Sequence, residues 1–242
     1  MGFLYAFKAY GLRGARIKQA IGAAFLLALV LAAANIAGAM AREVTVLAFG
    51  DSLTAGYGLA QDRSFPAQLE TALKARLGAG VRVVNAGVSG DTSAGGRARL
   101  DWVLSAIEGG APDLVIVELG ANDALRGIDP ALTRANLAAI LEELHQRGIP
   151  VLLAGMRAPP NMGADYGRAF DSIYPALARE YGVAAFYPFF LDGVAARPEL
   201  NQADGIHPTG EGVAIIVDRI LPHVLAALGR ESGAGASREL GQ

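Results

Sequence analysis

The chain has 242 residues, of which 52% are hydrophobic, and it carries 21 basic and 23 acidic side chains but no cysteine. This length suits one domain of ordinary size with a substantial core. Without cysteine, disulfides, thiol nucleophiles and cysteine metal sites are excluded, and the acidic balance argues against nucleic acid as a partner.

The first 41 residues have the pattern of a secretory signal peptide. Four basic residues come first, an apolar run interrupted only by Asn35 follows from position 20 to 39, and an A-x-A pattern ends at Ala41. We therefore expect a cleaved leader and an exported, periplasmic protein. The alternative is an uncleaved leader that anchors the chain in the inner membrane, because roughly 20 apolar residues can cross a bilayer. The leader would then be the only membrane contact.

Residues 42–229 alternate short apolar runs with longer helical patterns. Helical periodicity is clear at 130–147, before Gly148 and Pro150, and again at 209–228. Residues 230–242 are expected to be a disordered tail. The alternation predicts one domain with a parallel sheet that is covered by helices on both faces. The expected buried strands are 44–49, 81–85, 113–119, 151–156 and, less clearly, 183–189.

Polar and glycine-rich segments follow the first three of these strands. Ser52 comes directly after the first strand, "NAGVSGDTS" (85–93) includes the end of the second, and "ELGAND" (118–123) includes the end of the third. Ligands of an open parallel sheet bind outside the carboxyl ends of its strands. These three segments are therefore candidates for a functional site.

A serine nucleophile needs a base within hydrogen-bond reach, and the base needs a third group that orients it. Among three histidines, His145 and His223 fall in predicted helices, whereas His207 lies in the loop "ADGIHPTGEG", three residues after Asp204. At this spacing the aspartate can accept the imidazole Nδ1 proton, which leaves Nε2 free for Ser52. The alternative is structural, with Asp204 capping a turn and His207 on the surface.

Acyl transfer also needs hydrogen-bond donors for the negative charge that develops on the attacked carbonyl oxygen. The candidates are the backbone N–H groups of Ser52 and Gly90 and the side-chain amide of Asn122. Gly90 can turn its N–H inward because it has no side chain. The alternatives are a simple loop glycine at 90 and a turn or helix cap at Asn122.

Four segments, "FGDSLTAGYG", "NAGVSGDTSAGG", "ELGANDALRG" and "DGIHPTGEG", resemble the ordered blocks of the GDSL or SGNH hydrolases. They are most similar to the bacterial periplasmic branch of acyl-CoA thioesterases, lysophospholipases and arylesterases, over nearly all of residues 43–228. The resemblance implies an α/β fold, namely a flavodoxin-like three-layer α/β/α sandwich with a five-stranded parallel sheet. It also implies a Ser52, Asp204 and His207 triad, with Ser52, Gly90 and Asn122 as oxyanion donors.

The expected activity is hydrolysis of a small-molecule acyl or aryl ester, acyl thioester or lysophospholipid through an acyl-enzyme. It needs no cofactor and no metal, and it should weaken below about pH 6, where a histidine base is protonated. One alternative is a carbohydrate O-deacetylase of the same fold. Another is a non-catalytic flavodoxin-like protein that binds phosphate, although Gln61 replaces the third glycine of a G-x-G-x-x-G pattern.

Apolar residues around the fourth and fifth strands are candidates for a substrate pocket, with the hydrophobic core as the alternative. Arg157 could meet an anionic head group or form a surface salt bridge. We expect Asp51, Thr54 and Asp91 to hold the loops by local hydrogen bonds. The oligomeric state is not predicted. The pocket candidates are Met156, Pro159, Pro160 and Phe189, with Met162, Phe190 and Leu191 beside them.

Overall fold

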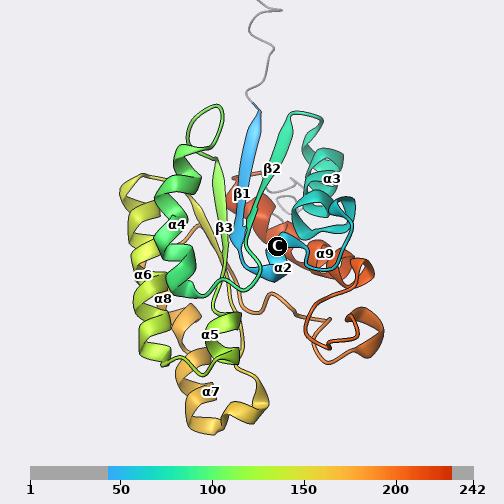
Figure 1. The fold of residues 1–242 in the computed structure, drawn as a ribbon. Helices are drawn as coiled ribbons and strands as arrows, with labels where there is room; N and C mark the ends of the chain where they lie inside the picture. The colour runs from blue at the N-terminus through green and yellow to red at the C-terminus, as the bar shows by residue number, and fades with distance from the viewer. Residues whose placement is uncertain (1–42, 231–242) are drawn as a thin grey trace, which may run out of the picture. The chain divides into compact units, whose positions relative to one another are not determined.

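The computed structural model describes residues 43–230, so the predicted leader and the tail after residue 230 lie outside the described part (Figure 1). Five parallel strands form one sheet in the order β2-β1-β3-β4-β5, which is the flavodoxin-like order. The predicted fold class is confirmed. The strands are β1 (Val44–Gly50), β2 (Val81–Gly87), β3 (Leu114–Glu118), β4 (Val151–Ala154) and β5 (Ala185–Tyr187).

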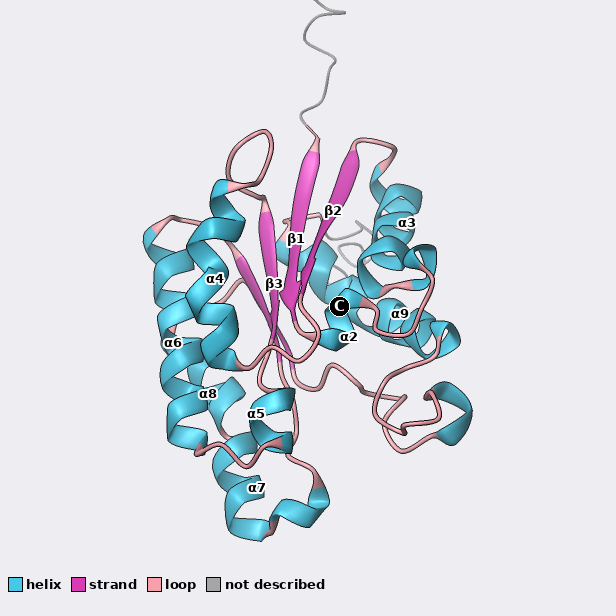
Figure 2. Cartoon of the chain, in the orientation of Figure 1, coloured by secondary structure: helices cyan, strands magenta, loops and turns pink. Residues whose placement is uncertain are grey.

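Helices cover both faces of the sheet (Figure 2). On one face lie α3 (Phe65–Leu77) and α9 (Gly210–Ala227), and on the other lie α4 (Ser93–Ser105), α6 (Pro130–Gln146) and α8 (Ile173–Glu180). Shorter helical elements connect them: α2 (Ser52–Ala55), α5 (Ala121–Leu125), α7 (Ala164–Asp171) and the 3₁₀ turns Gln61–Arg63, Pro160–Met162 and Pro198–Leu200. No helix among residues 43–230 is long and apolar enough to cross a membrane.

Local sequence signals account for the ends of the longer helices. Asp129 caps α6 by accepting a hydrogen bond from the Ala131 N–H at 2.9 Å, and Pro130 occupies the first turn. Gly148, with φ of 65°, turns the chain after the last residue of this helix. The predicted span 130–147 therefore matches α6 to within one residue.

The three central strands, β1, β3 and β4, are buried on both faces, as their apolar runs predict, whereas the edge strands β2 and β5 are only partly buried. Four consecutive β1 residues, from Val46 to Phe49, have no exposed surface. The expected fifth strand, 183–189, is shorter in the structure because Pro188, which lacks an N–H, follows its last residue, Tyr187. The sheet thus forms a rigid centre from which the loops at its carboxyl edge extend.

The order of the strands brings the candidate segments together. β1 pairs with β2 on one side and with β3 on the other, and Gly50 lies opposite both Gly87 and Glu118. The chain reverses its direction of winding at this point, which is where open parallel sheets bind ligands. Ser52, Gly90 and Asn122 all follow one of these three strand ends.

Candidate active site

Ser52 is the first residue of α2, two positions after the last residue of β1. Asp51 caps this short helix, since its Oδ1 accepts a hydrogen bond from the Leu53 N–H at 3.0 Å. The corner needs glycine at position 50, because a Cβ there would lie 2.1 Å from Thr54 Oγ1 and 2.6 Å from the carbonyl oxygen of Glu118. The carbonyl belongs to β3 and cannot move aside. The G-D-S sequence therefore presents Ser52 at the tip of the strand.

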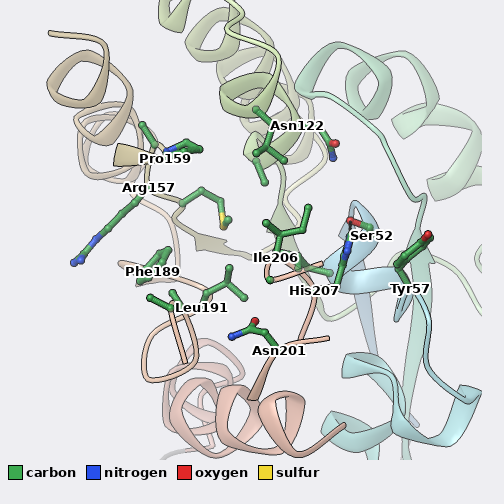
Figure 3. A pocket seen from close by; sticks show the side chains of 18 of the residues that line it. Ser52, Tyr57, Asn122, Arg157, Pro159, Phe189, Leu191, Asn201, Ile206 and His207 are labelled. Carbon is green, nitrogen blue, oxygen red and sulfur yellow. Dashed lines mark hydrogen bonds between the residues drawn. The ribbon is translucent and has the colours of Figure 1, made fainter. Parts of the chain in front are cut away.

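His207 lies next to Ser52, although 155 residues separate the two (Figure 3). Asp204 lies on the other side of the imidazole. His207 Nε2 is 2.9 Å from Ser52 Oγ, and His207 Nδ1 is 2.7 Å from Asp204 Oδ2. The other carboxylate oxygen, Oδ1, accepts the N–H groups of Ile206 and His207, each at 3.0 Å. The three side chains thus form a continuous Ser–His–Asp hydrogen-bonded chain.

The hydrogen bonds of Asp204 keep this carboxyl ionised. The charged form is stabilised most by the backbone N–H of His207, next by the His207 imidazole and then by the N–H of Ile206. Together these hydrogen bonds lower the pKa of Asp204 to about 2. A charged Asp204 can hold the imidazole in the tautomer with the proton on Nδ1. Nε2 is then free to accept the proton of Ser52.

The Tyr57 ring lies against the His207 imidazole, which sequence reasoning missed. The ring centroids are 4.5 Å apart, and the carbonyl of Tyr57 accepts a hydrogen bond from Gln202 Nε2 at 2.7 Å. Gln202 in turn donates its N–H to the His207 carbonyl at 2.7 Å. The loops that carry Tyr57 and His207 are therefore fastened to each other beside the serine.

Gly90 and Asn122, the remaining oxyanion candidates, border the same cavity as Ser52 and His207. Gly90 has φ of 85°, a conformation that favours glycine. Within residues 43–230, neither the Ser52 N–H nor the Gly90 N–H has a protein acceptor. Asn122 lies in the first turn of α5, and its Nδ2 donates to Asp51 Oδ2 at 3.1 Å, which leaves a second N–H on that nitrogen.

Arg99 connects the loops around these donors. Its guanidinium donates to Asp91 Oδ2 at 2.6 Å and to the carbonyls of Ala86 and Gly50 at 2.9 Å each. It also lies 4.3 Å above the centroid of the Phe49 ring. The expectation of local bonds at Asp91 was incomplete, because this carboxylate pairs with α4 and thereby joins the Gly90 loop to the ends of β1 and β2.

Two further contacts join the Gly90 loop to α5. Asp123, next to Asn122, accepts hydrogen bonds from the Ser93 N–H at 2.8 Å and from Thr133 Oγ1 at 3.0 Å. Arg126 Nη2 donates to the Gly90 carbonyl at 2.7 Å. The segments that carry Gly90 and Asn122 are therefore held to each other by Asp123 within α5 and by Arg126 directly after it.

Glu118, the last residue of β3, is a fully buried carboxyl that the sequence analysis did not single out. Its Oε2 accepts hydrogen bonds from Thr54 Oγ1 at 2.8 Å and from the Asp51 N–H at 3.4 Å. Burial, and then the nearby charge of Asp51, raise the pKa of Glu118 well above its ordinary value. Burial also raises the pKa of Asp51, to about 6, against the hydrogen bonds from Leu53 and Asn122. An ionisable residue at the end of the apolar run "LVIVE" was the available signal.

The raised pKa of Glu118 predicts a pH-dependent cost in stability. In the folded protein Glu118 keeps its proton, whereas in the unfolded chain this carboxyl loses it above its ordinary pKa of 4.5. The free energy of unfolding therefore falls as the pH rises from 4 to 7. Glu118→Gln removes this cost. In urea unfolding, the free energy of unfolding of the variant minus that of the natural protein should rise by about 1 to 3 kcal/mol from pH 4 to pH 7. The same difference between the two proteins at both pH values would contradict this explanation.

The cavity beside Ser52 has a volume of about 490 Å³ and a mostly apolar lining. All four principal pocket candidates line it, and so do Arg157 and Leu191. Arg157 forms no salt bridge within residues 43–230, and its guanidinium lies over the Phe189 ring, with Cζ 4.8 Å from the ring centroid (Figure 3). A contact with an anionic head group stays a prediction. Lining residues that sequence reasoning missed include Leu53, Tyr57, Leu125, Ala195, Ala196 and Ile206.

Met162 and Phe190, two of the neighbouring pocket candidates, do not line this cavity. Phe190 is fully buried in the core, where its ring packs edge-on against Phe65 at a centroid distance of 5.0 Å. Phe190 therefore belongs to the core, whereas Phe189 lines the cavity, and its contact with substrate stays a prediction. Consecutive residues in an irregular loop point in opposite directions.

The other two histidines lie in helices, as expected. His145 is exposed near the end of α6, and His223 in α9 packs beside the Tyr187 ring at a centroid distance of 5.2 Å. Over the described residues 43–230, no three histidine, aspartate or glutamate side chains are arranged to hold a metal ion.

Comparison with known proteins adds evidence that is independent of this geometry. A family model described as the GDSL-like lipase/acylhydrolase family matches residues 48–215. Esterase TesA of Pseudomonas aeruginosa is 42% identical over 182 residues, which cover 75% of this chain and 88% of that protein. An arylesterase of Vibrio mimicus is 39% identical over 203 residues, which cover 84% of this chain and 98% of the relative.

Solved structures agree with these matches. The crystal structure of AlinE4, described as an SGNH-hydrolase family esterase, has 54% sequence identity and a TM-score of 0.65, and it covers 78% of this chain and 99% of its own. The crystal structure of TesA has 40% identity and a TM-score of 0.70 over 76% of this chain and 99% of its own. Each of the two alignments extends over more than three quarters of this chain and almost all of the solved chain.

Proposed function

The chain belongs to the GDSL-like lipase/acylhydrolase family and is a carboxylic ester hydrolase, and we propose that Ser52, His207 and Asp204 perform its chemistry. The observation that carries the proposal is the hydrogen-bonded chain from Ser52 Oγ through His207 to Asp204, at 2.9 and 2.7 Å. A hydroxyl bonded to an imidazole, which is itself oriented by a carboxylate, is the arrangement that activates serine for acyl transfer.

The reaction proceeds in two acyl transfers. His207 Nε2 takes the Ser52 proton while Oγ bonds to the ester carbonyl carbon, and the negative charge on the carbonyl oxygen meets the N–H groups of Ser52 and Gly90 and the Asn122 amide. When the tetrahedral intermediate collapses, the bond to the leaving alkoxide or thiolate breaks and His207 gives that group its proton. Water, deprotonated by His207, then releases the acid and restores Ser52.

The apolar cavity supports a substrate with an acyl or aryl group beside the scissile bond. Leu53, Leu125, Met156, Phe189 and Leu191 offer carbon surface to such a group but few partners for sugar hydroxyls. The only tryptophan, Trp102, is 73% exposed on α4 and does not line the cavity. Acyl and aryl esters, with thioesters and lysophospholipids as further candidates, are therefore favoured over a carbohydrate O-acetyl group.

The proposal includes export to the periplasm. It rests on the basic start, the apolar run and the A-x-A pattern of residues 1–41, which lie outside the described residues. Mass measurement of the protein from a periplasmic extract would show a chain that begins at Arg42 if the leader is cleaved there. A full-length chain in the membrane fraction would support the anchor instead.

Covalent labelling tests the nucleophile directly. A fluorophosphonate should phosphonylate the protein once, and peptide mapping should locate the adduct at Ser52. Ser52→Ala should not react, whereas Ser105→Ala, which changes an exposed serine of α4 outside the cavity lining, should react normally. An adduct on another residue, or equal labelling of Ser52→Ala, would overturn the assignment.

With p-nitrophenyl esters of increasing acyl length, kcat/KM should rise with chain length and then fall when the chain exceeds the cavity.

A further inference from the structure

Two buried carboxyls that the reaction steps do not use lie directly beneath the nucleophile. Asp51 precedes Ser52, and Glu118 ends the neighbouring strand β3, where it lies opposite Gly50. Neither side chain has exposed surface. Because two adjacent buried carboxylates repel each other and lack water, such a pair is stable with one charge and one proton rather than two charges.

The contacts of the two groups differ in a way that assigns the charge. Each Asp51 oxygen accepts one N–H, Oδ1 from Leu53 at 3.0 Å and Oδ2 from Asn122 at 3.1 Å. Glu118 has the Thr54 hydroxyl and the long bond from the Asp51 N–H on Oε2, and its Oε1 has no partner among the described residues. A buried anion needs donors on both oxygens. The charge therefore belongs on Asp51 and the proton on Glu118.

A charged Asp51 also fixes the orientation of Asn122. An amide side chain has a donor end and an acceptor end that are nearly equal in shape, and either end can face a given neighbour. An ionised carboxylate only accepts hydrogen bonds, so it requires the nitrogen of Asn122 to face Oδ2. The opposite orientation would place the amide oxygen where the developing oxyanion needs a donor.

From this arrangement we infer that Asp51 is a positioning residue, which holds the Asn122 amide with its nitrogen in the oxyanion hole while the protonated Glu118 limits the pair to one negative charge. The inference rests on the proposed function, because it takes Asn122 as an oxyanion donor. Because Glu118 is fully buried, a second charge there would be poorly screened and would act against the oxyanion, so the proton on Glu118 also serves the reaction.

A double-mutant cycle tests the action of Asp51 through Asn122. In Asp51→Asn the new amide can face Asn122 with either its oxygen or its nitrogen, so the orientation of Asn122 is no longer fixed. For a short p-nitrophenyl ester, kcat should fall about 10- to 100-fold, and KM should stay within about threefold of the natural value. In the Asn122→Ala background the same change should lower kcat less than about threefold. An equal loss in both backgrounds would mean that Asp51 acts only on the structure, and would overturn the inference.

Asp129→Asn is the matched control. Asp129 caps α6 as Asp51 caps α2, but it is exposed and does not line the cavity. This variant should keep the natural kcat, and its melting temperature calibrates the loss of a helix cap. If Ser52 in the natural protein does not react with a fluorophosphonate, the proposed function itself fails. If Ser52 reacts but the cycle is additive, only the inference fails.

Infrared spectroscopy tests the position of the proton without Asp51 variants or activity. At pH 7 the natural protein should show the carbonyl band of a buried protonated carboxyl, Glu118→Gln should lose it, and the band should shift when the glutamate side chains carry a ¹³C-carboxyl label but not when the aspartate side chains do. A band that persists in folded Glu118→Gln, or no such band in the natural protein, would contradict the assignment of the proton to Glu118.

Discussion

Replacing His207 with alanine is expected to lower kcat by about 10⁴-fold or more, the largest effect of any single change away from Ser52. Without the imidazole, no other side chain in the described part of the chain is hydrogen-bonded to Ser52 Oγ to accept its proton, and the leaving group loses its proton donor. The fold should tolerate the change, because His207 lies in a loop and Asp204 still accepts the backbone N–H groups of residues 206 and 207. The measurement is p-nitrophenyl ester turnover, with a thermal melt of the same sample.

His145→Ala is the control for this prediction, since His145 is an exposed histidine on α6 outside the cavity. It should retain the natural kcat. The pH profile of the natural enzyme adds a second check, because Asp204, with its pKa lowered to about 2, stays charged from pH 4 to 8. The loss of activity on the acid side should therefore not involve Asp204, whereas protonation of Asp51, whose pKa burial raises to about 6, should contribute to it because the Asp51 carboxylate holds the Asn122 amide. A normal rate in His207→Ala would eliminate the proposed mechanism.

The fold could be predicted because its signals are local. The run "VTVLAFG" is apolar on both faces, and the structure buries it between two other strands. Asp129, Pro130 and Gly148 mark the ends of α6 by their own chemistry, without regard to distant contacts. Burial periodicity and caps act within one element, so one sequence is enough to find them.

Parts of the site could be predicted for a different reason. Serine, histidine and aspartate in loops at strand ends are chemically unusual, and the parallel sheet brings such loops to one edge. Sequence reasoning missed Tyr57, Arg99 and Glu118 because their roles depend on partners 8 to 150 residues away. Phe189 and Phe190 show the same limit, since an irregular loop has no period that says which of two adjacent rings faces the cavity.

Asn122→Ala is expected to lower kcat by about 10²- to 10³-fold, because it removes one donor from the developing oxyanion. The ester carbonyl in the ground state carries little charge, so the same hydrogen bond contributes little to substrate binding and KM should change by less than about threefold. Alanine suits the helical position, and the α5 backbone remains fixed by Asp123 and by the bond from Arg126 to the Gly90 carbonyl. The loss should therefore appear in steady-state kinetics of a folded protein, whose melting temperature falls because the buried Asp51 carboxylate loses the donor to its Oδ2.

Asn136→Ala separates this effect from a general loosening of the loops. Asn136 donates to Ser93 Oγ at 3.2 Å, in the network that holds the Gly90 loop to α6, but it does not line the cavity. If Asn122 acts on the transition state, Asn122→Ala should lose kcat, whereas Asn136→Ala should keep most of it. A fluorophosphonate should also phosphonylate Ser52 more slowly in Asn122→Ala but not in Asn136→Ala. A rise in KM with unchanged kcat would instead make Asn122 a ground-state binding residue. Equal losses in both variants would attribute the effect to loop order, because Asn136 lies too far from the cavity lining to donate to the oxyanion.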